Sequence, residues 1–420
     1  MIPAVVMKTV GSRADAEALD RTDPLAHIRS RFIIPDGVVY LDGNSLGALP
    51  TGVSEHLSEV VVQQWGRDLI TSWNEHGWMD MPARVGARIA PLIGALPREV
   101  VCADSTSVNV FKLLSAALRL RPDRHTILTD SGNFPTDIYI AGGLREFPGR
   151  RTQLVIVEET ALADAIDEDT AVVMATEVNY RTGRRHDMNA VTRAAQERGA
   201  LVLWDLAHSV GALPVDLDGI GADFAVGCGY KFLNGGPGAP AFLYVAERHL
   251  DAFHSPLAGW LGHESPFAFD LEYRPARGIE RTRVGTPPVL SMAALEAALS
   301  VFDDVEMSTV REKSLAMSEL LIALIEKRCH GLDIELVTPR DPERRGSQVS
   351  VRHPEAYAVM QALIARGFIG DFRAPDIMRF GLAPLYLRFT DVWDTAETLR
   401  EVLSSREFER PEYARRQRVT

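Results

Sequence analysis

Residues 201–238 read LVLWDLAHSVGALPVDLDGIGADFAVGCGYKFLNGGPG. Two apolar runs, residues 201–204 and 224–226, have the length of short buried strands. The first run ends at Asp205, and the second is followed by small residues, by Tyr230 and Lys231, and by a glycine-rich turn. Parallel strands that are buried on both faces have such unbroken apolar sequences. This stretch therefore predicts the centre of an α/β sheet.

The rest of the chain continues the same pattern. Apolar runs recur at residues 100–102, 126–128, 153–157, 171–174 and 241–245, and helical patterns such as 189–199 lie between several of them. Strands that alternate with helices indicate βαβ units in a mostly parallel sheet. After residue 288 the pattern changes to long helices at 289–302 and 307–328, followed by shorter elements that include 348–351 and 387–389. We expect a domain boundary near residue 290.

Composition excludes several functional classes. The 420 residues carry a net charge of −12, whereas nucleic-acid binding needs a basic surface. The three cysteines, Cys102, Cys228 and Cys329, are scattered, so neither a disulfide framework nor a metal site is predicted. The longest uncharged run, 232–246, is too short and too rich in glycine and proline for a membrane span. The apolar run among the first residues is too short for a signal peptide. We therefore predict a cytoplasmic protein without membrane or nucleic-acid partners.

Lys231 is the first candidate for chemistry. An amine between a buried strand and a glycine loop can form a Schiff base, because burial lowers the pKa of lysine. Taken alone, Lys231 is better explained as an ordinary surface lysine at a strand end. Whether Lys231 has a chemical role depends on which residues follow the other strands, because ligands of such sheets lie beyond the carboxyl ends of the strands.

Three other strand ends carry polar or aromatic groups. Residues 105–107, Ser-Thr-Ser, begin a helix, where they form either an anion site or an ordinary N-cap. Phe134 could stack on a planar cofactor and Asp137 could accept a hydrogen bond, although both also suit a proline turn. Asp205, followed by His208, is an acid at the end of a buried strand and needs a partner, such as a protonated pyridine nitrogen. Together with Lys231, these groups predict a site for pyridoxal 5′-phosphate (PLP).

Longer motifs carry a family resemblance. They are YLDGNSLG at 40–47, SGNFPTD at 131–137, VNYRTG at 178–183, WDLAHSVGALPVDL at 204–217, YKFLNGGPG at 230–238, GWLGH at 259–263 and MRFGLAPLY at 378–386. In this order, from about residue 20 to residue 400, they resemble the kynureninase family of fold type I PLP enzymes, within the aspartate aminotransferase superfamily. The resemblance implies a large PLP-binding domain (61–290) with a mostly parallel seven-stranded sheet flanked by helices. It also implies a smaller α+β C-terminal domain (291–420), an N-terminal segment (1–60) that packs with the small domain, and a homodimer with its active site at the subunit interface.

The resemblance also implies roles for single residues. Lys231 would form the Schiff base, Asp205 would pair with the pyridinium nitrogen, and His208 and the stacked ring of Phe134 would support the cofactor. The phosphate would be held by Thr106, Ser107 and Tyr230, with Trp260 and Thr286 from a second subunit, and the cofactor shell would be completed by Pro135, Thr136, Asp137 and Thr176. Tyr230 is also implied as a proton donor. Arg379 would clamp the substrate α-carboxylate, while Trp73, Gly285 and Thr286 match the bacterial pattern that prefers kynurenine.

The implied reaction is hydrolysis of L-kynurenine, and more weakly of 3-hydroxy-L-kynurenine, at the Cβ–Cγ bond. The products would be anthranilate (or 3-hydroxyanthranilate) and L-alanine, in tryptophan degradation or in NAD biosynthesis. One alternative is a cysteine desulfurase-like lyase, for which Cys329 is the only candidate nucleophile in the C-terminal part. A second alternative is a non-catalytic PLP-binding protein, which the presence of Lys231, Asp205 and Arg379 disfavours.

Overall fold

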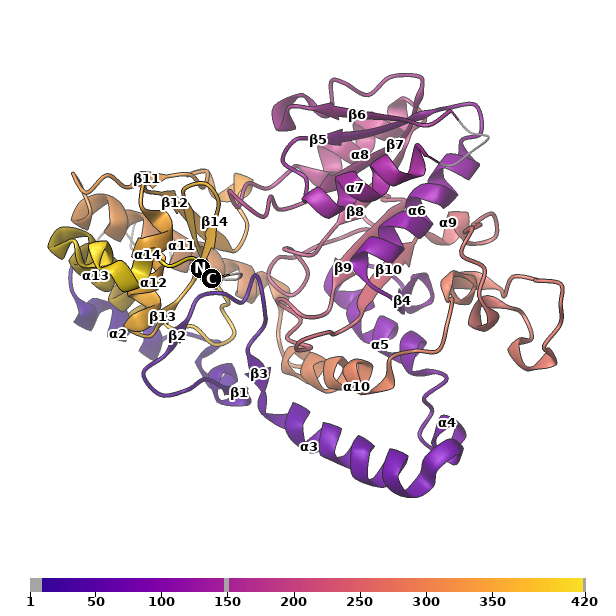
Figure 1. Cartoon of the computed structure of the whole chain (residues 1–420), viewed down its shortest axis with the longest axis horizontal. Coiled ribbons are helices and arrows are strands. Elements are labelled where there is room, and N and C mark those ends of the chain that lie inside the picture. The colour runs from indigo at the N-terminus through magenta and orange to yellow at the C-terminus, as the bar shows by residue number, and fades with distance from the viewer. Residues whose placement is uncertain (1–9, 147–150, 418–420) are drawn as a thin grey trace.

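The computed structural model describes residues 10–146 and 151–417. The described chain forms a large α/β domain built around one sheet and, beside it, a smaller C-terminal domain (Figure 1). The predicted α/β class and the separate C-terminal domain are therefore confirmed. The positions of the domain boundaries remain a prediction.

The large sheet has seven strands in the order β4-β10-β9-β8-β7-β5-β6. Only β10 runs antiparallel to its neighbours. The predicted mostly parallel sheet is thus confirmed. Its strands are β4 (Val100–Cys102), β5 (Thr126–Asp130), β6 (Gln153–Val157), β7 (Thr170–Thr176), β8 (Leu201–Asp205), β9 (Phe224–Cys228) and β10 (Ala241–Val245).

Alternation along the buried strands divides the core between two faces. Leu201 and Leu203 of β8 pack in the apolar cluster that contains residues of α6 and α7, whereas Val202 and Trp204 pack in the cluster that contains residues of α5 and α8. Helices therefore cover both faces, as an apolar parallel sheet requires. The helices of this domain are α5 (Met81–Ile89), α6 (Thr106–Leu120), α7 (Pro135–Leu144), α8 (Met188–Glu197), α9 (Glu247–Leu250) and α10 (Val289–Ala298).

The smaller domain holds an antiparallel sheet with the order β11-β12-β15-β14. Its strands are β11 (Glu335–Leu336), β12 (Gln348–Arg352), β14 (Asp371–Arg373) and β15 (Ile377–Gly381). Its helices are α11 (Met307–Arg328), α12 (Ala356–Ala365), α13 (Phe389–Ser405) and α14 (Pro411–Ala414). Residues 387–389 are not a separate short element: Arg388 is the N-cap of α13, and Asp391 accepts a hydrogen bond from its main chain.

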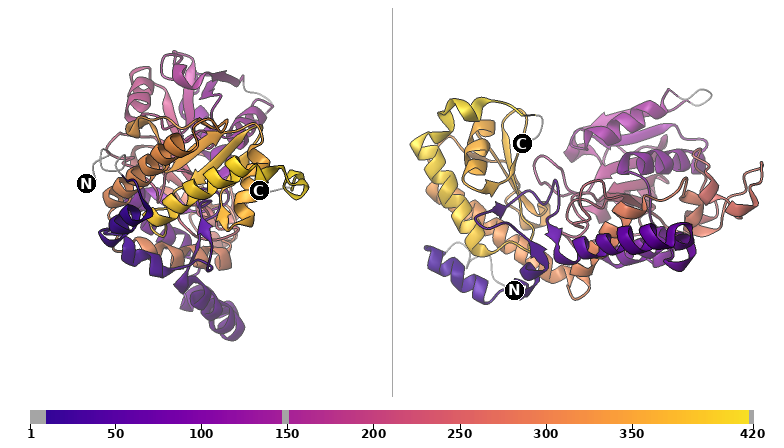
Figure 2. Two further views of the ribbon diagram at one scale, coloured as in Figure 1. Left: turned by 90° about the vertical axis from the view of Figure 1, so that its left-hand side faces the viewer. Right: turned by 60° about the horizontal axis from the view of Figure 1, so that its bottom comes forward.

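The N-terminal part of the chain contacts both domains. Helix α2 (Arg13–Arg21) packs on α13, as Figure 2 shows, and β2 (Val39–Tyr40) pairs in parallel with β13 (Phe368–Ile369). Strands β1 (Phe32–Ile33) and β3 (Leu49–Pro50) pair with each other and lead into α3 (Thr51–Glu59), which packs on α10. A π-helix at Val60–Asp68 and the short helix α4 (Ser72–Glu75) follow, and residues 51–75 together are called the α3 arm. Among the described residues, no helix is long and apolar enough to cross a membrane.

Candidate active site

Lys231 lies just beyond β9, among groups that follow two other strands, β8 and β5. Its Nζ is 2.9 Å from Nε2 of His208 and 5.8 Å from the ring centroid of Phe134. Burial, followed by the charge of Lys231, lowers the pKa of His208 well below its ordinary value. The imidazole is therefore neutral, and its Nε2 can accept a hydrogen bond from the lysine amine.

Two carboxyl groups are buried beside the lysine. Asp205, at the end of β8, is 4% exposed and accepts a hydrogen bond of 2.8 Å from the main-chain N–H of Ala207. Asp137, in the first turn of α7, is fully buried, and neither of its carboxyl oxygens has a hydrogen-bond partner among the described residues. Burial raises the pKa of both groups; the charge of Asp205 raises that of Asp137 further, and the charge of Lys231 opposes both shifts.

Unpaired buried polar atoms are costly, and a concentration of them needs an explanation. Both oxygens of Asp137 and Nδ1 of His208 lack partners within the described chain, and both residues lie near Lys231. A polar ring that hydrogen-bonds to these atoms would remove the cost. The residues present therefore fit a planar cofactor with a nitrogen that can carry a proton.

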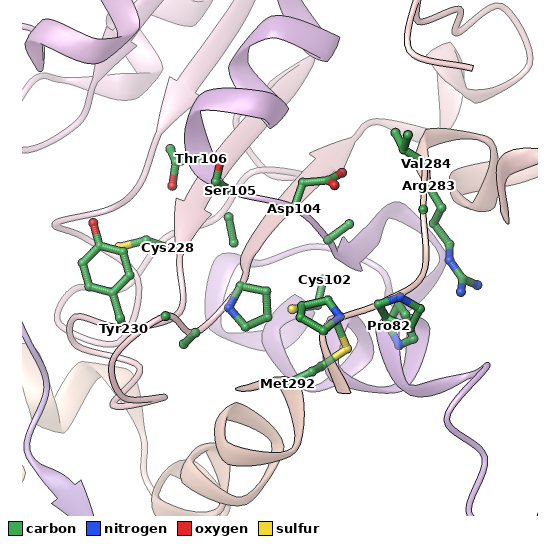
Figure 3. A pocket seen from close by; sticks show the side chains of 18 of the residues that line it. Pro82, Cys102, Asp104, Ser105, Thr106, Cys228, Tyr230, Arg283, Val284 and Met292 are labelled. Carbon is green, nitrogen blue, oxygen red and sulfur yellow. The ribbon is translucent and has the colours of Figure 1, made fainter. Parts of the chain in front are cut away.

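Residues 105–107, for which either an anion site or an ordinary N-cap was expected, lie at the start of α6. Ser105 is the N-cap and its hydroxyl accepts from the N–H of Val108, so the ordinary capping role is real. Thr106 and Ser107 then occupy the first turn, where main-chain N–H groups are free to bind an anion. Together with Tyr230, Gly285 and Thr286, Thr106 lines a cavity of about 540 Å³, part of which Figure 3 shows.

The turn that carries Phe134 is held by hydrogen bonds. Asn133 donates to Thr129 and accepts from its own neighbour, the N–H of Phe134, and the hydroxyl of Thr176 donates to the Asn133 side chain. Pro135 and Thr136 then begin α7, with Phe134 as the N-cap. Phe134 is 40% exposed and meets Tyr180 edge-on at 5.1 Å, so one face of its ring is available for stacking.

A further cluster lies beneath this turn. Side-chain atoms of Asp130, Glu159 and His186 lie within 4.8 Å of one another, a composition that could hold a metal ion. Arg184 donates to Glu159 at 2.8 Å, and Nε2 of His186 lies 3.2 Å from Oδ2 of Asp130. We assign it the role of bracing the turn, since Asp130 also accepts from the N–H of Gly132.

Arg379, in β15, is only 1% exposed and lies in a cluster that the sequence did not reveal. Its Nε donates to Asp371 at 2.6 Å, its Nη2 donates to Asp371 and to Ser45, and its Nη1 donates to the carbonyl of Tyr180. The guanidinium fork that was expected to clamp a substrate carboxylate is thus engaged by a protein carboxylate. The signal that could have revealed this is the pair of opposite charges at 371 and 379, on two strands joined by a short turn.

The turn at 40–47 also belongs to the site. The N–H of Gly47 donates to the carbonyl of Tyr230 at 2.8 Å, which joins the N-terminal segment to the lysine loop. A Cβ at Gly47 would collide with the carbonyl oxygen of Lys231 and lie 2.6 Å from Cα of Asn234. Only glycine fits this close approach.

Two predicted residues stand apart from this group. Trp73 packs edge-on against Trp78 at 5.5 Å, on α4 at the end of the α3 arm (Figure 1). Trp260 is 40% exposed and packs on Phe267 in a segment that extends from the large domain. Gly285 and Thr286 line the cavity of their own chain, next to Thr106 and Tyr230.

Comparisons with known proteins give both near and distant relatives. Residues 310–399 match the family described as the kynureninase C-terminal domain. A kynureninase of Burkholderia mallei (strain SAVP1) is 52% identical over 419 residues, covering 99% of this chain and 100% of the relative. A kynureninase of Pseudomonas fluorescens is 50% identical over 414 residues, covering 97% and 100%.

Among solved structures, the apo cysteine desulfurase from Thermococcus onnurineus NA1 superimposes with a TM-score of 0.75 at 18% identity, covering 90% of this chain and 98% of that one. A lysine-to-alanine mutant of C-DES, with glycine linked covalently to its PLP cofactor, also gives a TM-score of 0.75 at 18% identity, covering 88% and 98%. At this identity the likeness shows the fold alone, and that fold is shared with PLP enzymes.

Proposed function

The chain belongs to the kynureninase family, and from this membership we infer that it is a PLP-dependent hydrolase that cleaves the Cβ–Cγ bond of L-kynurenine to give anthranilate and L-alanine. The observation in the structure that supports this function is the set of unpaired buried polar atoms of Asp137 and His208 near Lys231. A site of this kind suits a bound polar cofactor.

The residues present suggest how PLP would be held. Lys231 would bind its carbonyl carbon, Asp205 would hold a proton at the pyridine nitrogen, and Phe134 would cover one face of the ring. The start of α6, with Thr106 and Ser107, would receive the phosphate. When bound, the cofactor supplies an electron sink that makes the bonds of the substrate α-carbon labile.

Side chains of the protein would carry out the proton transfers. Once free of the cofactor, the Lys231 amine would take the proton from the substrate α-carbon, and neutral His208, 2.9 Å away, would hold the amine in place. Burial, then the charges of Cys228 and Asp205, raises the pKa of Tyr230, so its hydroxyl keeps its proton and can donate it. Arg379 would bind the substrate α-carboxylate, which fixes the orientation of the α-carbon.

The test uses L-kynurenine, PLP and the fluorescence of anthranilate. Wild-type protein should produce anthranilate, and Lys231→Ala should abolish both turnover and the absorbance of the lysine-bound cofactor. Lys327→Ala changes an exposed lysine of α11 and is the matched control, which should retain both. Unchanged turnover in Lys231→Ala would contradict the assignment.

For the aromatic end of the substrate we propose a preference for kynurenine over 3-hydroxykynurenine. The proposed contacts are Trp73, Gly285 and Thr286, and the indole of Trp73 offers no acceptor for a ring hydroxyl. A higher kcat/KM for 3-hydroxykynurenine would refute this preference.

The desulfurase-like alternative finds no support in the thiol that it requires. Cys329 is 1% exposed at the end of α11, and burial raises its pKa to about 11. A buried thiol of high pKa is a poor nucleophile.

We further propose that the protein is a cytoplasmic homodimer with its active sites at the subunit interface. The three free, buried cysteines are consistent with a reducing compartment. Two exposed apolar segments support the dimer: Trp65, Leu69 and Ile70 on the α3 arm, and Phe267, Phe269 and Leu271 near Trp260. Light scattering after gel filtration should give the mass of two chains.

A further inference from the structure

Arg379 and Asp371 are opposite each other in neighbouring strands. They are register partners in the antiparallel pair β14–β15, so their side chains leave the sheet side by side on one face. Both residues are 1% exposed, and Asp371 receives two hydrogen bonds from the guanidinium, through Nε and Nη2. The strand register places the two side chains next to each other, and the two hydrogen bonds hold the guanidinium against Asp371.

The hydrogen bonds leave one direction open. An arginine has five N–H groups, and four of those on Arg379 reach Asp371 (two), Ser45 and the carbonyl of Tyr180. The fifth, on Nη1, has no partner among the residues that the structure describes. The edge formed by Nε and Nη2 is closed, so an incoming carboxylate can approach only from the Nη1 side.

The charges around Asp371 favour a stable ion pair with Arg379. Burial alone would raise the pKa of Asp371, but the hydrogen bonds and charge of Arg379 lower it below its ordinary value, so the carboxylate stays ionised. Arg373, on the same strand, lies 2.8 Å from the same carboxylate. Asp371 is therefore held between two arginines and keeps one of them in a single orientation.

We propose that Asp371 is a positioning residue for substrate recognition, which fixes the guanidinium of Arg379 so that its Nη1 side faces the substrate α-carboxylate. This inference rests on the proposed function in one respect only, that Arg379 receives that carboxylate. Asp371 does not touch the substrate. It acts by removing the rotational freedom that a long arginine side chain would otherwise lose on binding.

The experiment measures ligand binding to the holoenzyme as well as turnover. Asp371→Asn keeps the shape of the side chain but loses its charge, and Asp371→Ala removes the contact. L-Alanine, titrated against the absorbance of the bound cofactor, should bind about tenfold more weakly to Asp371→Asn and weaker still to Asp371→Ala, since a charge-assisted pair is lost. Ethylamine, which has no carboxylate, should bind equally to all three proteins. KM for L-kynurenine should rise with the L-alanine Kd, and kcat should change less.

Three results would overturn the proposal. The first is L-alanine binding to Asp371→Asn that is as tight as in wild type or tighter. This result would show that the charge of Asp371 weakens carboxylate binding by offsetting the charge of Arg379. The second is a loss of ethylamine binding by the same factor as L-alanine binding, which would indicate general damage to the site. The third is an equal loss in the control Glu335→Gln, which removes one of the two acidic partners of Arg352 elsewhere in the same sheet. If wild-type protein released no anthranilate, the proposed function would fail, while the L-alanine titration would still test Asp371.

Discussion

Asp42 is a single residue whose ionisation is set by the arginine cluster around Arg379. Burial, and then the charge of Asp371, raises its pKa to about 7, although Ser45 and the arginines oppose the shift. Its Oδ1 is buried without a hydrogen-bond partner among the described residues. The ionisable groups that act on it or are acted on by it are Tyr40, Asp371, Arg373, Arg379 and Tyr386.

The raised pKa of Asp42 predicts a loss of stability with rising pH. In the unfolded chain the carboxyl ionises near its ordinary value of 3.8, whereas in the folded protein it stays protonated up to about pH 7. The folded state therefore binds more protons between these values, and the contribution of Asp42 to the free energy of unfolding falls across this window. We expect Asp42→Asn to be more stable relative to wild type at about pH 8 than at about pH 5, as measured by urea denaturation. Parallel pH profiles for the two proteins would show that Asp42 ionises normally.

Gly47 tests the contact between the N-terminal turn and the lysine loop. Gly47→Ala would force the main chain of Lys231 and Asn234 to move, so we expect turnover to fall by a factor of about one hundred or more, as it does when catalytic groups are displaced by about 1 Å. Gly52→Ala, in α3, places its Cβ in open space and is the matched control. It should leave turnover unchanged and raise stability slightly, because alanine favours helix. Equal activity of the two variants would show that the loop tolerates the shift.

Some residues of the candidate site could be predicted from the sequence, whereas others could not, for a physical reason. Asp205, Lys231 and Thr106 each follow an apolar strand, so the parallel sheet brings them to one edge. Asp371 gives no such signal, because its role depends on the register of a hairpin in another domain. Strand β15 was likewise not predicted, although it carries Arg379. It is short and almost fully buried, and its arginine interrupts the apolar pattern.

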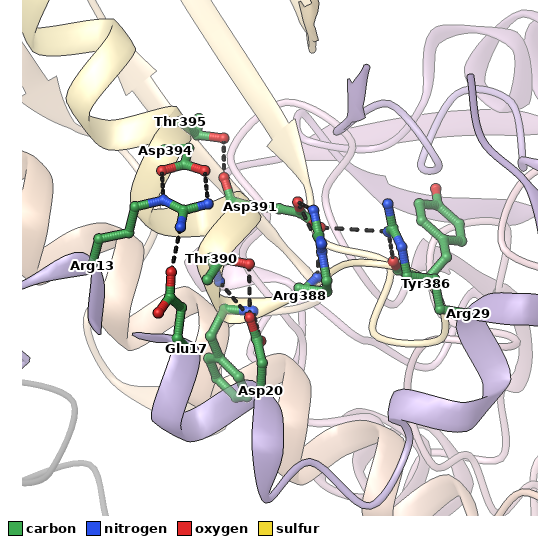
Figure 4. Close-up of polar contacts among 11 residues, drawn as sticks. Arg13, Glu17, Asp20, Arg29, Tyr386, Arg388, Thr390, Asp391, Asp394 and Thr395 are labelled. Atoms are coloured by element: carbon green, nitrogen blue, oxygen red, sulfur yellow. Dashed lines mark hydrogen bonds and ion pairs between the residues drawn. The ribbon is translucent and has the colours of Figure 1, made fainter. Parts of the chain in front are cut away.

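At the scale of elements, α13 depends on a residue far away in the sequence. The carboxylate of Asp20, in α2, accepts from the main-chain N–H groups of Phe389 and Thr390 and from the Thr390 hydroxyl (Figure 4). These N–H groups belong to the first turn of α13, where the helix itself provides no acceptor. Asp20 thereby fastens the N-terminal helix to the C-terminal domain.

We expect Asp20→Ala to lower the free energy of unfolding by about 1–2 kcal/mol, the usual cost of losing a helix cap. Glu17→Ala, one turn away on α2, removes only an exposed ion pair with Arg13 and should cost less than about 1 kcal/mol. Urea denaturation of both variants provides the comparison. A similar loss for the two would mean that α2 is held by its apolar face rather than by the cap.

At the scale of the whole molecule, two predicted site residues, Trp73 and Trp260, lie apart from the candidate active site. Trp73 and Trp260 lie in the two segments that also expose large apolar side chains, the α3 arm and the region around Phe267. A second chain that covered these segments would bury them and could bring either tryptophan to a neighbouring site. The proposed dimer therefore accounts for both the exposed surface and the isolated tryptophans.

Mixing two inactive variants tests this arrangement directly. Lys231→Ala lacks the proposed catalytic amine, and Trp260→Ala is expected to lose much of its cofactor affinity. If Trp260 acts across the interface, a mixed dimer contains one complete site, with Lys231 from one chain and Trp260 from the other. Unfolding and refolding the two variants together should then restore anthranilate production to as much as about a quarter of the wild-type rate, since half of random dimers are mixed and each has one intact site. Activity no greater than that of the separately refolded proteins would place Trp260 in the site of its own chain.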